Sequence, residues 1–194
     1  MLDITYSAVK VTVMEVSRKI VLLIISLLFF TAIAGAEPQG HSIDNLQAQV
    51  FFSPRGGCTE AVVDTISQAK TEILVQAYSF TSAPIAKALV DAHKRGVYVA
   101  IILDRSQRKA RYSSADFTAH AGIPTYIDSA HAIAHNKVMI IDKSMVITGS
   151  FNFTKAAEEK NAENLLVIRS KELASTYIEN WQRHKEHSES YKGR

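Results

Sequence analysis

The chain has 194 residues, of which 47% are hydrophobic and 21% charged, a balance that excludes a disordered or fibrous protein. Its formal net charge of +3 is a mild bias toward anionic partners, too weak to identify a nucleic-acid-binding protein on its own. The single cysteine, Cys58, excludes an intramolecular disulfide and a cysteine-based metal site, and we expect it to be a small buried residue of a helix.

A targeting segment is predicted at residues 1–36. The pair Arg18-Lys19 precedes the apolar run Ile20–Ile33, and Ala34-Gly35-Ala36 forms a small-x-small cleavage site. The charged region before the apolar run is long for a signal peptide. Met14 would be a tidier initiator, because the basic pair follows it closely.

The alternative to a cleaved signal peptide is an uncleaved membrane anchor. The apolar run is at the short end of the ~17–25 residues that a membrane-spanning helix needs, so we expect cleavage. The mature chain would begin at Glu37 and act in the periplasm or outside the cell, without stable membrane association. It would consist of a linker at residues 37–47 and one domain at residues 48–194.

Strand-like and helix-like segments alternate through this domain. Short apolar runs bounded by turn residues predict strands at 48–52, 72–78, 97–103, 123–127, 138–141, 145–147 and 163–169. Amphipathic segments predict helices at 59–70, 84–95, 114–121, 154–160 and 171–187. This order is typical of an α/β fold in which helices connect the strands of a sheet. We expect Trp181 of the last helix to be a core residue.

The most informative stretch runs from His135 to Asn152. Two apolar runs joined by Lys143-Ser144 predict a hairpin, with His135 and Lys137 at the start of its first strand. Residues 149–152, Gly-Ser-Phe-Asn, leave the end of the second strand, so both ends should meet at one edge of the sheet. An imidazole, an ammonium, a hydroxyl and a carboxamide gathered there suit a phosphoryl group.

The same stretch resembles the H-x-K-x4-D-x6-G-S-x-N signature of the phospholipase D superfamily, with every specified position filled. Four segments are similar to the small bacterial endonucleases of that superfamily: Phe52-Ser-Pro, Ala77-Tyr-Ser-Phe-Thr81, Lys94-Arg-Gly-Val97 and Gly149-Ser-Phe-Asn-Phe-Thr-Lys-Ala-Ala157. The resemblance implies an α/β/α sandwich with a mixed central β-sheet. It also implies a homodimer in which two signatures, one from each chain, meet at the interface.

The resemblance further implies a mechanism without metal or other cofactor. One His135 attacks phosphorus, the second chain's copy protonates the leaving oxygen, and water resolves the phosphohistidine. Lys137 and Asn152 would hold the phosphate, and Ser150 would support them. In the family's nuclease branch, a glutamate at the place of Glu163 orients the catalytic histidine. An ordinary solvated glutamate is the alternative for this position.

Asp142 belongs to the signature, but it lies at the far end of its strand from His135. A strand rises about 3.3 Å per residue, so Asp142 cannot touch that histidine within one chain. We interpret it as structural, capping the Lys143-Ser144 turn. A metal site formed by His131 and His135 at i,i+4 spacing is not expected, because the segment is a loop without converging acidic residues. The remaining histidines are expected at the surface: His41, His93, His120, His184 and His187.

Candidate substrate contacts follow two predicted strands. A basic loop after the strand at 97–103 could track a phosphate backbone, or could simply be solvated; it carries Arg105, Arg108, Lys109 and Arg111. After the strand at 72–78, Tyr78 and Phe80 could stack on a base or pack into the protein.

Three functions are compatible with these patterns. The first is a metal-independent endonuclease that cleaves DNA, with RNA as a further substrate, and has little sequence preference. The second is a phospholipase D-type hydrolase acting on phospholipid head groups, which the lack of an apolar surface segment beyond the leader disfavours. The third, an inactive nucleic-acid-binding module, is disfavoured by the intact signature.

Overall fold

The structure, a computed structural model, describes residues 47–110 and 113–194. The predicted targeting segment, nearly all of the predicted linker, His41 and Arg111 lie outside the described residues. None of the described helices combines the length and the apolar character that a membrane span requires.

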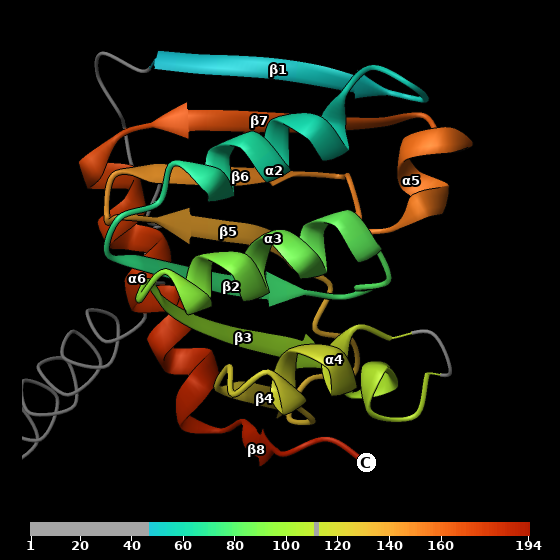
Figure 1. Cartoon of the computed structure of the whole chain (residues 1–194), viewed down its shortest axis with the longest axis vertical. Helices are drawn as coiled ribbons and strands as arrows, with labels where there is room; N and C mark the ends of the chain where they lie inside the picture. Colours follow the sequence, from blue (N-terminus) through green and yellow to red (C-terminus); the bar gives the residue numbers. More distant parts are fainter. Residues whose placement is uncertain (1–46, 111–112) are drawn as a thin grey trace, which may run out of the picture. The chain divides into compact units, whose positions relative to one another are not determined.

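Eight strands form one mixed sheet in the order β1-β7-β6-β5-β2-β3-β4-β8 (Figure 1). Their bounds are β1 Gln47–Ser53, β2 Glu72–Ala77, β3 Tyr98–Asp104, β4 Thr125–Asp128, β5 Lys137–Ile141, β6 Met145–Gly149, β7 Glu163–Arg169 and β8 Glu189–Tyr191. β2 pairs with β3, and β3 with β4, in parallel, whereas every other pairing is antiparallel. The predicted mixed central sheet is therefore confirmed.

Helices cover both faces of this sheet. The helices α2 (Cys58–Ser67), α3 (Ala83–Lys94) and α4 (Ala115–His120) lie on one face, and α6 (Lys171–Glu186) lies on the other (Figure 1). A short 3₁₀ helix, η1 (Arg105–Arg108), and α5 (Lys155–Glu159) follow strand ends. The sandwich of three layers that the sequence predicted is thus confirmed.

Strand alternation divides the core into two parts. Ile73 and Val75 of β2 pack with the residues of α2 and α3, whereas Leu74 packs with Trp181 on the α6 side. Successive side chains of a strand point to opposite faces, so a fully apolar strand can supply both layers. Trp181 is buried as expected, and its indole N–H donates to the carbonyl of Val75 at 2.9 Å. Cys58 is also fully buried, as expected, and burial raises the pKa of its thiol to about 11.

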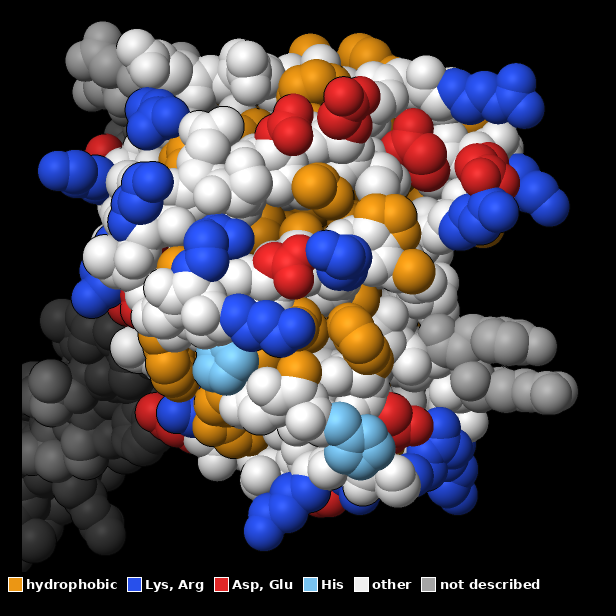
Figure 2. Space-filling model, in the orientation of Figure 1, with side chains coloured by type: hydrophobic (Ala, Val, Ile, Leu, Met, Phe, Trp, Pro, Cys, Tyr) orange, Lys and Arg blue, Asp and Glu red, His pale blue; other side chains and the backbone are white. Residues whose placement is uncertain are grey.

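The face covered by α2, α3 and α4 carries charges of both signs (Figure 2). Lysine and arginine side chains alternate there with acidic ones and with small apolar areas, and they form no continuous basic surface. This face therefore offers no continuous positive surface to which a polyanion would bind. The signature residues His135 and Lys137 lie instead at one edge of the sheet.

The strand register defines that edge. Ala77, the last residue of β2, pairs with Lys137, the first of β5, and also with Leu103 near the end of β3. At the same edge, the last residue of β3, Asp104, pairs with the last residue of β4, Asp128. The carboxyl ends of three parallel strands and the start of β5 consequently meet along one side of the sheet.

Candidate active site

The predicted hairpin places the signature as expected. Lys137 begins β5, Gly149 ends β6, and the antiparallel register between these strands brings the two ends together. His135 is exposed just before β5, and its ring centroid lies 4.4 Å from that of Tyr78, which follows β2. The imidazole is thus reachable from solvent and rests against an aromatic ring.

Gly149 allows the backbone to turn out of β6. Its φ of 146° is one that side-chain-bearing residues rarely adopt. A Cβ at this position would lie 2.3 Å from the carbonyl oxygen of Asn164. That oxygen accepts hydrogen bonds from the N–H groups of Ser150 and Phe151, both at 3.1 Å. A larger residue would displace the segment that carries Ser150 and Asn152.

Lys137 is a buried cation. Its side chain donates to the carbonyl of His135 at 2.7 Å, and its Nζ lies 5.1 Å from the centroid of the Tyr78 ring. Among the described residues it forms no ion pair within 4 Å. Burial lowers the pKa of Lys137, while the charge of Glu163 acts in the opposite direction. An anion next to this ammonium would stabilise its charged form.

Ser150, Glu163 and Asn164 form a hydrogen-bonded group beside Lys137. The Ser150 hydroxyl donates to Oε2 of Glu163 at 2.6 Å and accepts from the N–H of Asn164 at 3.1 Å. Glu163 also accepts from Asn161 at 3.2 Å. Among the described residues, no hydrogen bond joins Glu163 to His135, so the expected contact between these two is not formed in the single chain.

Asn152 follows Ser150 by two residues and is half-buried. Its side-chain oxygen Oδ1 is buried, and among the described residues it has no hydrogen-bond partner. Unpaired buried polar atoms are uncommon in folded proteins, and they often mark functional positions. This oxygen is an acceptor, so a phosphate would contact the amide N–H groups of the side chain instead.

Asp142 has a structural role, as expected, but it does not cap its own turn. Its carboxylate accepts from the backbone N–H groups of Lys70, Thr71 and Glu72 at 2.9, 2.7 and 3.1 Å. The Thr71 hydroxyl adds a fourth hydrogen bond at 2.8 Å. Burial acts to raise the pKa of Asp142, but these donors outweigh it and lower the pKa. Asp142 therefore fixes the connection between α2 and β2, at the edge opposite His135.

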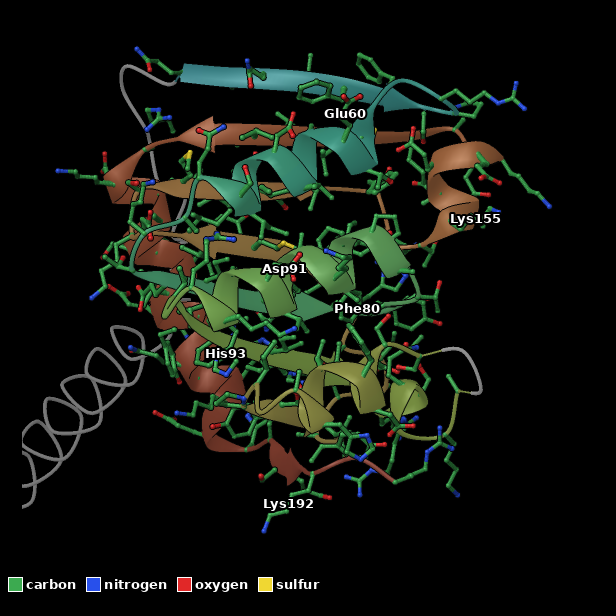
Figure 3. The ribbon with its side chains drawn as sticks, in the orientation of Figure 1. Glu60, Phe80, Asp91, His93, Lys155 and Lys192 are labelled. Atoms are coloured by element: carbon green, nitrogen blue, oxygen red, sulfur yellow. The ribbon has the colours of Figure 1, made fainter. Side chains whose placement is uncertain are left out.

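The candidate substrate contacts differ in their exposure and in their partners. Phe80 is fully buried at the carboxyl end of β2, where its N–H donates to Oε1 of Gln107 and its carbonyl accepts from Ser114, so a base-stacking role is wrong (Figure 3). Tyr78 lies in the site, as described above. Arg105 and Lys109 are exposed after β3, whereas Arg108 of the same loop pairs with Glu189.

Sequence reasoning missed a second polar cluster. His184 and His187 were expected at the surface; His187 is exposed, but the side chain of His184 is only 15% exposed. Both contact Asp128, as does His131. The expectation that no acidic residue converges with His131 was also wrong. The spacing His184-x-x-His187 on one face of the last helix was the available signal.

Comparisons with known proteins agree with the fold and the signature. Residues 62–185 match the family described as "Cardiolipin synthase, PLD-like domain". Phospholipase D of Rickettsia bellii is 49% identical over 130 residues, which cover 67% of this chain and 65% of that protein. Phospholipase D of Rickettsia prowazekii is 42% identical over 153 residues, covering 77% of this chain and 75% of that protein. This chain belongs to the phospholipase D superfamily.

Solved structures place the chain beside small bacterial members. The crystal structure of Nuc from Salmonella typhimurium, a phospholipase D family member, has a TM-score of 0.74 and 44% identity. The match covers 77% of this chain and 100% of that chain. NucT from Helicobacter pylori, at a TM-score of 0.70 and 24% identity, shares the fold. The resemblance to the small bacterial branch is confirmed by these matches.

Proposed function

We propose that this protein is a phosphodiesterase that cleaves DNA as an endonuclease with little sequence preference, through a phosphohistidine formed on His135. The observation that carries the proposal is Lys137, a buried ammonium without an ion-pair partner among the described residues. It lies over the same Tyr78 ring that the exposed His135 imidazole contacts. A buried cation is costly unless it is compensated, so the position favours an anionic ligand.

The proposed reaction has two steps. A ring nitrogen of His135 attacks phosphorus, and the bond from phosphorus to the leaving oxygen breaks while a second imidazole protonates that oxygen. Water then attacks the phosphohistidine, gives its proton to the second imidazole, and frees His135. Lys137 and the Asn152 carboxamide would stabilise the charge on the non-bridging oxygens, with Ser150 supporting them through Glu163.

We propose that the second imidazole is His135 of a second copy of the chain. The signature occurs once in the sequence, so a single chain supplies one such histidine. A two-fold interface brings the same residue to the axis twice. The exposure of His135 leaves its imidazole accessible at such an interface. A second copy could also bring Glu163 to His135.

The exposed Arg105 and Lys109 support a polymeric phosphate as the substrate. They follow β3, whose carboxyl end lies at the same edge as Lys137. Successive phosphates of a nucleic acid could contact them while one phosphate occupies the catalytic position. Phospholipid hydrolysis is the second candidate, and it is favoured by relatives named phospholipase D and, at 30% identity, mitochondrial cardiolipin hydrolase of Mus musculus.

A three-substrate assay distinguishes these candidates. The purified protein is incubated with plasmid DNA, RNA or phosphatidylcholine vesicles, each in the presence of EDTA. We expect nicking and linearisation of the plasmid by the wild type and no turnover by His135→Asn. His120→Asn, the same change at an exposed position on α4, is the matched control and should retain activity. Release of choline without DNA cleavage would assign the phospholipase function instead.

Mixed dimers test the shared site. Co-expression of differently tagged chains followed by tandem purification yields dimers with one wild-type chain and one His135→Asn chain. Because one histidine cannot serve as both nucleophile and proton donor in a single turnover, we expect the mixed dimer to have far less than half of the wild-type rate. A rate near one half would mean that each chain owns a complete site. An active monomer would also contradict the shared site.

A further inference from the structure

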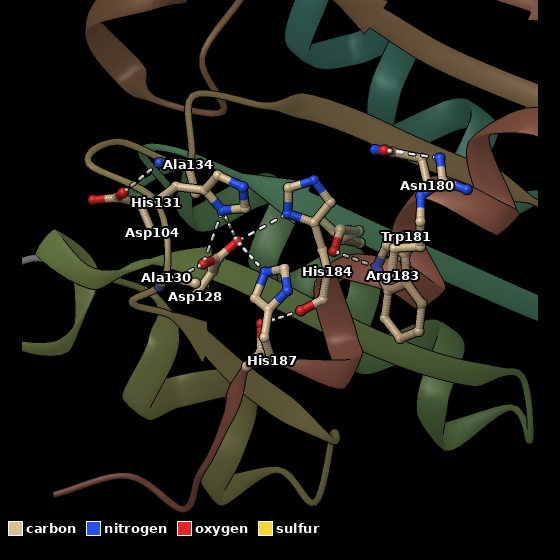
Figure 4. A network of polar contacts seen from close by, with 12 residues as sticks. Asp104, Asp128, Ala130, His131, Ala134, Asn180, Trp181, Arg183, His184 and His187 are labelled. Carbon is tan, nitrogen blue, oxygen red and sulfur yellow. Dashed lines mark hydrogen bonds and ion pairs between the residues drawn. The ribbon is translucent and has the colours of Figure 1, made fainter. Parts of the chain in front are cut away.

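Three histidines surround one buried carboxylate at the carboxyl end of β4 (Figure 4). Asp128 is completely buried, and its Oδ1 accepts from the N–H of Ala130 at 3.0 Å. Its Oδ2 lies 2.9 Å from Nδ1 of His184, 3.0 Å from Nδ1 of His131 and 3.3 Å from Nε2 of His187. A nitrogen of each ring therefore faces the same small volume beside the carboxylate.

The four side chains are packed closely enough to share one ion. The rings of His131 and His184 are stacked with centroids 4.8 Å apart, and His187 lies 5.1 and 5.4 Å from them. One ligand atom from each residue can be chosen so that all four lie within 4.8 Å of one another. Tetrahedral zinc with bonds near 2.0–2.1 Å requires ligand atoms roughly 3.3 Å apart. Binding would therefore require the side chains to close in from separations of up to 4.8 Å.

The charge of Asp128 also suits a cation. Among the described residues, its ion-pair partners are these three histidines. A fully buried carboxylate needs a compensating charge. One protonated imidazole would supply that charge, and so would a divalent ion. The ion would in addition bind a nitrogen lone pair of each of the three imidazoles, whereas a proton engages only one of them.

We propose that Asp128, His131, His184 and His187 bind a zinc ion. Three imidazole nitrogens and one carboxylate oxygen are ligands that zinc prefers, and four protein ligands describe a closed, structural site. The proposal is independent of the substrate of the enzyme, because it concerns a second cluster.

The ligands come from three separate segments, and this defines what the ion would do. Asp128 ends β4, and His131 belongs to the loop that leads to His135. His184 lies in the last turn of α6, and His187 directly follows that helix. Zinc would join the end of α6 to the sheet and fix that loop, which the hydrogen bond from Ala134 to Asp104 at 2.8 Å also restrains.

The ion would not act on the substrate phosphate. The strands β4, β3, β2 and β5 are consecutive neighbours, and Asp128 and Lys137 lie at the same edge of the sheet. Three strand spacings separate these two residues by roughly 14 Å. Zinc at the cluster is therefore compatible with cleavage that needs no metal at the phosphate.

The zinc content of the purified protein tests the proposal directly. The full chain, purified without a histidine tag and stripped with chelator, is equilibrated with Zn²⁺ and then freed of unbound metal. We expect one zinc ion per chain by mass spectrometry, and visible absorption bands of tetrahedral Co²⁺ when cobalt replaces zinc. Zinc a hundredfold above its Kd should raise Tm by about 5–10 °C. Zinc content below one ion per chain, with no such bands and an unchanged Tm, would mean that the cluster is a hydrogen-bonded network only.

Variants locate the ion. His184→Ala with His187→Ala should abolish stoichiometric zinc binding, the cobalt bands and the zinc-dependent rise in Tm. His131→Ala changes a partly exposed loop residue, so it should fold even if the α6 variant does not, and it should weaken zinc binding at least tenfold. His120→Ala is the control and should bind zinc as the wild type does. Equal zinc binding by all variants would place the ion elsewhere and refute the proposal.

Discussion

Asp142 offers a sharp test of the structural reasoning, because it is part of the signature but lies away from the reaction. We predict that Asp142→Asn destabilises the protein and leaves its catalytic constants unchanged. Asparagine is the suitable replacement since residue 142 has a φ of 50°, which asparagine tolerates better than alanine. The backbone conformation should therefore survive the change.

The size of the effect follows from the four hydrogen bonds. The remaining carbonyl of asparagine can still accept from Thr71 and Glu72, as Oδ1 does in the wild type. The new amide group would face the N–H of Lys70, which donates to Oδ2 at 2.9 Å. The variant loses the negative charge and places one N–H donor against another. The free energy of unfolding should therefore fall by about 2 kcal/mol, which lowers Tm by about 4–8 °C. Asp64→Asn, an exposed carboxylate on α2, is the matched control and should change Tm little.

The pH dependence gives an independent check. The pKa of Asp142 is lower in the folded state than its ordinary value of 3.8. Its stabilising contribution is therefore fully present above pH 3.8 and is lost as pH falls through the folded pKa. Urea unfolding should show a difference between wild type and Asp142→Asn that is larger at pH 7 than at pH 3. Equal stability at pH 7, or a loss of kcat without a loss of stability, would refute this reasoning.

Three further predictions concern the reaction and the leader. Because burial lowers the pKa of Lys137 below the ordinary lysine value of 10.5, the ammonium should lose its charge, and kcat/KM should fall, before pH 10.5 is reached; a flat alkaline profile would argue against a charged Lys137 in the reaction. Cleavage should survive EDTA well below Tm, since Lys137 supplies the charge at the phosphate, and loss of activity restored by a divalent ion would contradict the phosphohistidine mechanism. On export, the N-terminal sequence should begin at or near Glu37, whereas membrane-bound protein that retains Arg18 would indicate an anchor.

Most of the fold was predictable because hydrophobic periodicity is local. β7 was predicted with its observed bounds, and the other predicted strands and helices differ from the observed ones by a few residues at their ends. β8, Glu189–Tyr191, was missed because it has no apolar run and exists only as the edge partner of β4. Such a strand forms only through pairing with a distant segment, and the local hydrophobic pattern of the sequence does not predict that pairing.

The candidate site was predictable for a different reason, namely the fixed spacing of the signature within one hairpin. The errors arose where a partner lies far away in the sequence. Phe80 is buried in the core, and its backbone forms hydrogen bonds with Gln107 of η1 and with Ser114. Asp128 and His184 are 56 residues apart, and no local rule connects them.

The arrangement around Lys137 balances stability against ligand binding. A direct carboxylate partner would stabilise the buried ammonium, but it would also occupy the place of the proposed phosphate. Burial lowers the pKa of Lys137, and the nearby charge of Glu163 offsets part of that effect, yet the oxygens of Glu163 accept hydrogen bonds from Ser150 and Asn161. The ammonium is thus partly compensated and remains available. If Ser150 were alanine, Glu163 would be free to approach Lys137 and compete with the substrate, so the serine would support catalysis without touching phosphorus.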